Sequence, residues 1–147
     1  GSMYIVLFPP NTAPDEHSHI ATAYYDANKI LFRNSVDEEG YVLVRKTDAQ
    51  IQDKMAISLA DASYYYNQLL QKGGQEPAAL NRGPLAAPFV AHLPQAVGIA
   101  IGWLFHANGM ITLYLGKITA LLFYLLFGAI LLYFQPFLND NYALLFR

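Results

Sequence analysis

Cysteine is absent from this 147-residue chain, which excludes disulfide bonds and thiolate metal sites. A basic patch is also missing: the formal net charge is -2, so nothing in the composition argues for nucleic-acid binding. Charge itself is scarce in the second half, where Arg82 and Lys117 are the only charged side chains between Pro77 and Asn139. The sequence therefore predicts a polar N-terminal half followed by a membrane-embedded C-terminal half.

The longest apolar run covers residues 110–134, MITLYLGKITALLFYLLFGAILLYF, and contains one charge, Lys117. As an α-helix this run would reach roughly 37 Å, enough to cross a hydrocarbon core of about 30 Å. Its apolar residues surround the whole helix, which is typical of a helix buried in lipid or in a large core. A chain of this length suggests one domain with little room for such a core. We therefore predict a transmembrane helix over residues 110–135; the alternative is a core helix of a compact soluble domain, packed against residues 48–72.

The flanking segments complete the predicted organisation. Gly1 and Ser2 precede Met3 and are interpreted as a scar of tag cleavage. Residues 3–8 resemble the end of an earlier apolar helix, although a short buried strand or turn fits them equally well. Residues 9–90 are expected to form an external subdomain, and residues 136–147 a cytoplasmic tail.

Four segments are predicted inside the external subdomain. A helix over 15–28 begins after Pro14, with Thr12 or Asp15 as its cap and an apolar face of Ile20, Ala23, Tyr24 and Ala27. Alternating runs predict a β-hairpin over 29–46 with an acidic loop. Apolar spacings of three and four predict an amphipathic helix over 48–72 that ends at a glycine pair. A connector rich in Pro and Gly follows over 73–90.

Residues 91–109 are predicted to form a juxtamembrane helix, and Asn108 and Gly109 should end it. Gly98 and Gly102 make a G-x-x-x-G pair, which would let another helix approach closely. Two arrangements remain open. In the favoured one this helix lies on the membrane surface and leads into a single span, as short apolar runs often do. In the other, both helices cross the membrane as a hairpin.

The segment that could carry chemistry is residues 14–19, PDEHSH. On a helix that begins near Asp15, the side chains of Asp15 and His19 are four residues apart and share a face, and Asp26 falls near it. A carboxylate beside an imidazole could act as a base and its partner, or as two ligands of a divalent metal that would need a third from elsewhere. The alternative interpretation is a helix cap with solvated acids and surface histidines.

Three segments resemble DUF2142, a family of bacterial multi-spanning membrane proteins of unknown function. Residues 9–19, PPNTAPDEHSH, are similar to its loop motif of a Pro-rich start followed by Pro-Asp-Glu, two variable residues and His. Residues 92–98, HLPQAVG, resemble its Tyr-x-Pro-Gln-Ala-x-Gly stretch, with His92 in place of the aromatic residue. Residues 114–117, YLGK, resemble its Tyr-x-Gly-Arg segment. The matches come in family order and span most of the chain.

The resemblance implies a function, because DUF2142 in turn resembles the GT-C-like glycosyltransferases that use polyprenyl-phosphate-linked sugars. In those enzymes an acid of the first external loop sits at the active site. By this resemblance Asp15 is the general base or metal-binding acid, and Glu16 and His19 support or orient it. Lys117 stands where the family has Arg and would hold a lipid phosphate, as a point charge and without the fork of Arg. The alternative for Lys117 is a lysine that snorkels from a helix end.

The predicted fold is thus a mainly α membrane protein fragment with amphipathic external helices, a small β-hairpin, a juxtamembrane helix and one transmembrane helix. The first functional hypothesis is the first-external-loop region of a glycosyltransferase that modifies cell-envelope glycans, in the bacterial plasma membrane, with residues 9–109 outside. Its partners would be membrane lipids, a polyprenyl-phosphate-linked sugar and other transmembrane helices; the chain alone is expected to be inactive. The second hypothesis is a non-enzymatic membrane module that binds a partner helix or a lipid head group.

Overall fold

The computed structural model describes residues 15–52 and 62–134. In order, the elements are α2 (Glu16–Ile30), β1 (Leu43–Arg45), α3 (Lys46–Gln52), α4 (Ala62–Leu70), β2 (Pro77–Ala79), α5 (Phe89–Leu104) and α6 (Gly109–Phe134). The predicted helix remnant at 3–8, the Pro-rich loop at 9–14, the centre of the predicted helix 48–72 and the tail at 136–147 lie outside the described residues. The described residues are mainly α, as the sequence predicts, and they contain one two-stranded sheet.

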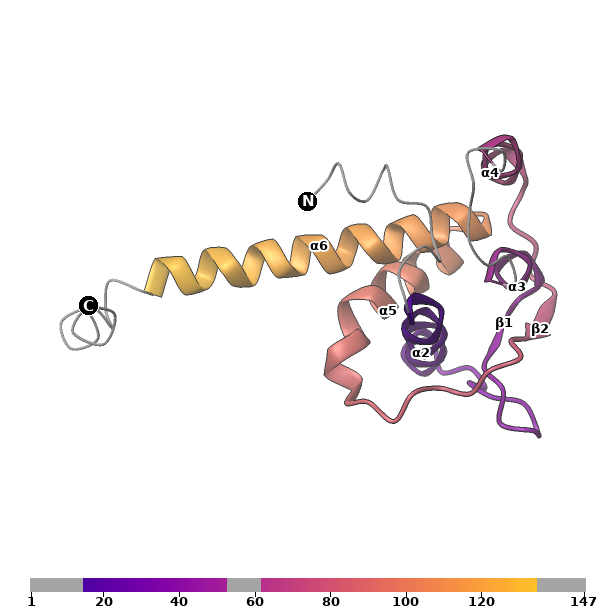
Figure 1. The fold of residues 1–147 in the computed structure, drawn as a ribbon, viewed down its shortest axis with the longest axis horizontal. Helices are drawn as coiled ribbons and strands as arrows, with labels where there is room; N and C mark the ends of the chain where they lie inside the picture. Colours follow the sequence, from indigo (N-terminus) through magenta and orange to yellow (C-terminus); the bar gives the residue numbers. More distant parts are fainter. Residues whose placement is uncertain (1–14, 53–61, 135–147) are drawn as a thin grey trace.

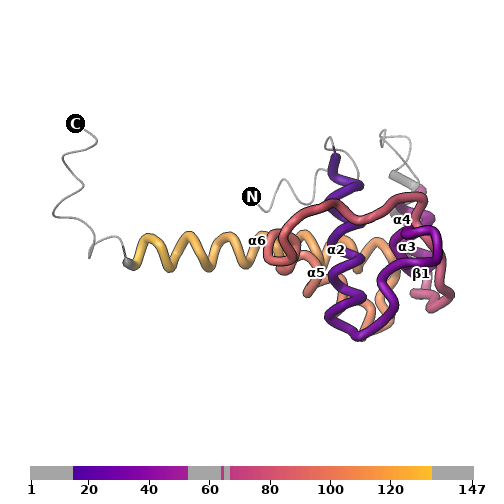
Figure 2. The backbone as a smooth tube through the Cα atoms, turned by 90° about the horizontal axis from the view of Figure 1, so that it is seen from below, coloured from indigo at the N-terminus to yellow at the C-terminus, as the bar shows by residue number. Residues whose placement is uncertain are grey.

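The described elements form a compact head from which the second half of α6 projects (Figure 1). Helix α2 is seen end-on in Figure 1 and runs across α6 in Figure 2, so the two helices cross. The first turns of α6 pack in the head, where Met110, Thr112 and Leu113 are almost fully buried. The later turns are exposed on every side, and only 6% of the most apolar 18-residue part of the helix is buried. Among the described residues no element buries the later turns of α6, although the first turns of α5 line a groove beside Leu122 and Leu126.

The buried face of helix α2 is the apolar face that the sequence predicts. Ile20, Ala23, Tyr24 and Ala27 recur at spacings of three and four, and all four are buried in the head. Glu16 in the first turn and Lys29 in the last complement the helix dipole. Local periodicity was sufficient here because one side of the helix packs mainly on α5.

The predicted hairpin over 29–46 is wrong in its pairing. Lys29 and Ile30 continue α2, and the residues after it turn away through Phe32, whose φ of 54° ends the helix. A tight turn does form around the acidic residues, closed by an isolated bridge between Val36 and Val42. Strand β1, however, pairs antiparallel with β2, with Val44 opposite Ala78.

Strand β2 was missed because its sequence, Pro-Ala-Ala, has neither β-branched residues nor alternation. It therefore lies inside the segment predicted as a connector, 73–90. Pro77 sits at the first position of the strand, where a missing N–H is tolerated. Residues 77–79 form a strand because their backbone hydrogen-bonds to that of β1, and their own sequence does not indicate this contact.

A buried polar network ties the start of α6 to the rest of the head. Arg45 and Asp48 form an ion pair with an Nε–Oδ2 distance of 2.7 Å, and their side chains are 4% and 0% exposed. The Arg45 guanidinium also donates to Ala107 O at 2.7 Å and to Thr112 Oγ1 at 2.9 Å. Trp103 Nε1 donates to Asp48 Oδ2 at 2.9 Å. The network joins β1, α3, α5 and α6, and nothing in the sequence pattern indicated it.

The sequence predicts that Asn108 and Gly109 end the first apolar helix, but α5 already ends at Leu104, and these two residues begin α6 instead. Asn108 Oδ1 accepts from Ile111 N at 2.8 Å, which caps α6, and its side-chain amide donates to Leu69 O. A Cβ at Gly109 would come 2.7 Å from Thr47 O, so this position requires a residue without a side chain. Helix α5 begins at Phe89, earlier than the predicted 91, and it ends at Leu104 rather than 109.

Candidate functional site

Asp15 opens α2 and presents its carboxylate to solvent. Its φ is 59°, a left-handed conformation, and its side chain makes no capping hydrogen bond. The backbone carbonyl, rather than the carboxylate, accepts from Ser18 N and His19 N. The cap interpretation of Asp15 therefore lacks its defining hydrogen bond, and the carboxylate faces outward from the start of the helix.

Glu16 is joined to Lys117. The Lys117 Nζ lies 2.7 Å from Glu16 Oε1, and the two side chains are only 17% and 16% exposed. This ion pair fastens the first turn of α2 to the part of α6 that leaves the head. Lys117 is thus directed toward a carboxylate of the same chain, which differs from a lysine that extends freely to the membrane surface.

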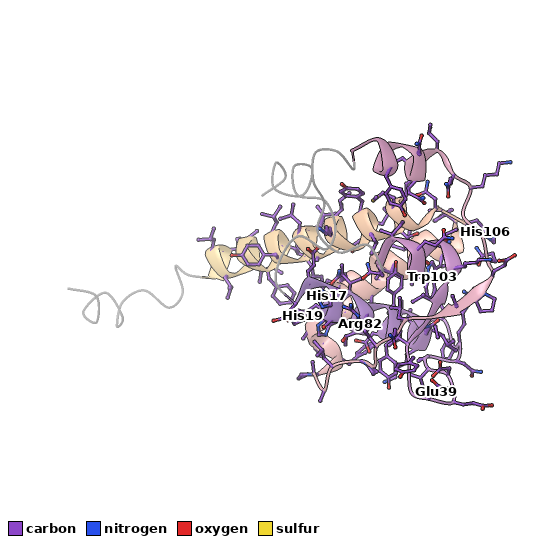
Figure 3. The ribbon with its side chains drawn as sticks, turned by 45° about the vertical axis from the view of Figure 1, so that its right-hand side comes forward. His17, His19, Glu39, Arg82, Trp103 and His106 are labelled. Carbon is purple, nitrogen blue, oxygen red and sulfur yellow. The ribbon has the colours of Figure 1, made fainter. Side chains whose placement is uncertain are left out.

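His19 is joined to His92 across the interface of α2 and α5. His19 Nδ1 and His92 Nε2 are 3.0 Å apart, and the rings stack with centroids 5.4 Å apart. A hydrogen bond between two imidazoles needs one donor and one acceptor nitrogen, so at least one of the rings must be neutral. Figure 3 shows His17 and His19 at the edge of the head nearest the free part of α6, with Trp103 and His106 toward the opposite edge.

Asp26 and His92 are the buried titratable groups of this interface. Burial raises the pKa of the Asp26 carboxyl, and Lys29 and His92 oppose that shift. Burial, followed by the charge of His19, lowers the pKa of His92, and Asp26 opposes that shift. Asp26 Oδ2 and His92 Nδ1 are buried without a hydrogen-bond partner among the described residues. His92 is therefore held neutral at pH 7 and can serve as the neutral member of the imidazole pair.

The lowered pKa of His92 predicts how stability depends on pH. The folded chain binds a proton at His92 less readily than the unfolded chain, whose His has a pKa of about 6.5. Stability should therefore be constant above that value and fall as the pH drops through it toward the folded pKa. The melting temperature in detergent, measured by circular dichroism from pH 8 to about pH 5, should fall on the acid side. His92→Phe should flatten this part of the profile; an unchanged profile in that variant would assign the acid sensitivity to groups other than His92, and not to Asp26, whose raised pKa stabilises the folded chain as the pH falls.

Helix α6 of the same chain packs against Gly98 and Gly102, the glycine pair of α5. A Cβ at Gly98 would come 2.7 Å from the Cα of Gly116, and one at Gly102 would come 2.7 Å from Thr112 Oγ1. The close approach predicted from G-x-x-x-G is present, and its partner helix is α6. On the other side of the same contact, a Cβ at Gly116 would lie 3.2 Å from Gln95 Cγ.

The three segments that carry the family resemblance meet at one place. The first is joined to the third by Glu16 and Lys117 and to the second by His19 and His92. The second and third pack on each other through Gln95 and Gly116. Segments far apart in the chain thus meet at the first turn of α2, where two separate side-chain pairs, Glu16–Lys117 and His19–His92, lie next to the exposed Asp15. We call Asp15, Glu16, His19, His92 and Lys117 the fork site.

The sequence left open the possibility that Asp15 and His19 are ligands of a divalent metal. Within residues 15–52 and 62–134, no group of three or more His, Asp or Glu side chains is arranged to hold a metal ion. The described side chains therefore do not by themselves fit a divalent cation.

Sequence reasoning named four of the five side chains of the fork site, and it treated His92 only as a departure from the family pattern. The spacing of three and four that linked Asp15 to His19 and Asp26 also links His92 to Ala96 and Ile99, which marks His92 as part of the buried face of α5. That periodicity was the available signal. Comparisons of the chain with family models, with curated proteins and with solved structures find no match.

Proposed function

We propose that this chain is the first-external-loop region, with the following transmembrane helix, of a membrane glycosyltransferase that uses a polyprenyl-phosphate-linked sugar to modify cell-envelope glycans. The proposed location is the bacterial plasma membrane, with residues 9–109 on the external side. Two lines support this: the resemblance of three segments to DUF2142, and the meeting of those segments at the fork site.

The membrane part of the proposal is supported by α6. Residues Gly109–Tyr133 are long and apolar enough to cross a membrane, and large apolar side chains such as Leu125 and Leu131 are more than half exposed. Exposure of this much apolar surface along one helix is costly in water and favourable in a bilayer. Other transmembrane helices, of the same protein or of an oligomer, would pack on this surface and complete the substrate cavity. For that reason the chain by itself is expected to be inactive.

The observation that carries the catalytic part is the position of Asp15. Its carboxylate is exposed, makes no capping bond, and begins the helix whose next residue is tied to the emerging part of α6. In the proposed reaction this carboxylate takes the proton of an acceptor hydroxyl as the hydroxyl oxygen bonds to the sugar and the lipid phosphate departs. Glu16 and His19 hold the first turn of α2 in place through Lys117 and His92.

Lys117 is proposed to hold the lipid phosphate while it also contacts Glu16. Its ammonium is already paired with Glu16, so a phosphate would have to share Lys117 with that carboxylate or displace it. A lysine has three donors and can contact both groups. Lys117 thus combines a positioning contact with the proposed binding of phosphate.

Asp15→Asn in the full-length protein tests the proposal. The change removes the base and leaves a side chain of the same shape, so sugar transfer to envelope glycan should be abolished while the amount of protein in the membrane stays the same. Folding should be affected by no more than about 0.5 kcal/mol, because the carboxylate makes no capping contact. Glu38→Gln, at an exposed acid of the turn after α2, is the matched control and should retain full transfer.

Retained transfer in Asp15→Asn would show that the carboxylate is not the base. A loss of transfer in both variants would point instead to a general dependence on surface charge. Either outcome would leave the membrane part of the proposal to be decided by the labelling experiment below.

A further inference from the structure

The loop before α5 and the first turns of that helix expose an apolar surface. No charged side chain occurs from Gly83 to Gly116. The exposed large apolar residues of this region are Leu85, Phe89, Val90 and Val97, and Val90 is 73% exposed. Apolar side chains concentrated at one end of a helix usually mark a partner or a membrane.

The register of α5 against α6 shows where this surface lies. The two helices run antiparallel, because Gly102 packs beside Thr112 and Gly98 beside Gly116. Further along, Leu93, Pro94 and Val97 share an apolar groove of about 300 Å³ with α6; its residues there are Thr119, Leu122, Phe123 and Leu126. At 1.5 Å per residue, Leu122 and Leu126 lie roughly 8 and 14 Å beyond Lys117 along the helix axis.

The figures agree with this register. In Figures 1 and 2 the first turns of α5 are the part of the described head that reaches furthest along α6 toward its free end. The other end of α5 lies near the start of α6, where Phe105 is also apolar and 80% exposed. The two ends of α5 therefore present comparable apolar groups at different heights along α6.

The sequence predicted that this helix would lie along the membrane surface, and the packing supports a different placement. Ala96, Ile99 and Trp103 are buried between α5 and its neighbours, so the middle of α5 belongs to the head. Of its two exposed ends, the N-terminal one lies beside the exposed apolar part of α6. The contact of His19 with His92 and that of Glu16 with Lys117 form a polar border on the head side of the exposed end.

We infer that the N-terminal end of α5 enters the bilayer leaflet nearest the head, beside α6, through the exposed side chains of Leu85, Phe89 and Val90. His92 stays on the face that packs against α2, and lipid acyl chains fill the groove between α5 and α6. The inference rests on the proposed membrane span of α6. It commits to lipid because the surface is continuous with the exposed apolar part of α6, lacks charge, and starts about 8 Å beyond Lys117, within the depth of about 5–10 Å that interfacial helices reach. The head is thus held by two contacts, which fixes the height of the fork site at the membrane surface.

The absence of cysteine allows a direct test with single-cysteine variants. Val90→Cys, Phe105→Cys and Leu125→Cys each replace an exposed apolar residue and can be labelled with an environment-sensitive fluorophore. The whole chain is reconstituted in phosphatidylcholine vesicles, with and without lipids that carry a nitroxide quencher on the acyl chain. Leu125→Cys reports the span, Val90→Cys the inserted end, and Phe105→Cys is the matched control at the opposite end of α5.

The expected result is strong quenching at Val90→Cys and Leu125→Cys, at least about twofold greater than at Phe105→Cys. Quenching at Leu125→Cys with Val90→Cys no different from Phe105→Cys would overturn the inference and leave the span standing. A blue-shifted but unquenched fluorophore at Val90→Cys would mean that protein, such as a second copy, covers this end. No quenching at Leu125→Cys would remove the span and the inference together. Phe89→Cys, one residue away, repeats the measurement if Val90→Cys folds poorly.

Discussion

Arg45→Met should destabilise the head by about 3–5 kcal/mol, the usual cost of leaving one charge of a buried ion pair without its partner. Asp48 is completely buried, and Arg45 supplies two of the hydrogen bonds to its carboxylate. The same substitution deprives Ala107 O and Thr112 Oγ1 of their donor, so the turn into α6 loses its attachment to β1. Chemical unfolding in detergent, followed by circular dichroism, measures the change.

The control is the neighbouring residue. Lys46 pairs with Glu76 at 3.0 Å, but these side chains are 62% and 74% exposed. Solvent screens such a pair, so Lys46→Met should cost no more than about 1 kcal/mol. Equal effects of the two substitutions would mean that Arg45 is not buried as described and that another contact holds α6 to the head.

Gly98→Ala should force α5 and α6 apart. The added methyl group would overlap Thr119 Oγ1 and the backbone of Leu115 and Gly116, and backbone cannot move aside as the tip of a side chain can. Overpacking of this kind costs about 1–3 kcal/mol. The loss should appear as a lower melting temperature, and as greater accessibility of a thiol introduced at Thr119, which lies beside Gly98.

Gly128→Ala is the control on α6 itself. A Cβ at Gly128 meets nothing within 4 Å among the described residues, and alanine favours the helix by up to about 1 kcal/mol over glycine. This variant should be as stable as the original chain or slightly more so. If Gly98→Ala were equally harmless, the two helices would not be in the close contact described. If Gly128→Ala weakened association with a partner helix instead, it would identify where that partner packs.

The location of the apolar helix could be predicted from sequence because its signal is local. The prediction of residues 110–135 differs from α6, Gly109–Phe134, by one residue at each end. The buried face of α2 was also correct, since Ile20, Tyr24 and Ala27 follow the helical period. The acidic turn at 37–40 formed as well: Asp37 Oδ1 accepts from Tyr41 N, and Gly40 takes a φ of 86°.

The strand pairing could not be predicted because the two strands are far apart in the sequence. The alternating pattern favoured a hairpin between 29–33 and 41–46, the nearest possible pairing. In the structure Lys29 and Ile30 are instead the last residues of α2. Strand β1 then pairs with β2, more than thirty residues later, whose Pro-Ala-Ala sequence has no strand signal. The pairing is decided by which backbone lies beside β1 once the helices have packed.

The sequence by itself determined where α2 and α6 lie, which helix is apolar on all sides, and which residues of the first turn of α2 are candidates for chemistry. These follow from side-chain period and composition, which act within a few residues. Only the tertiary structure decided that Glu16 pairs with Lys117, that His19 pairs with His92, and that Arg45 and Asp48 are buried together. Those contacts join residues on different elements, and they exist because the packing of α2, α5 and α6 brings distant side chains within hydrogen-bonding distance.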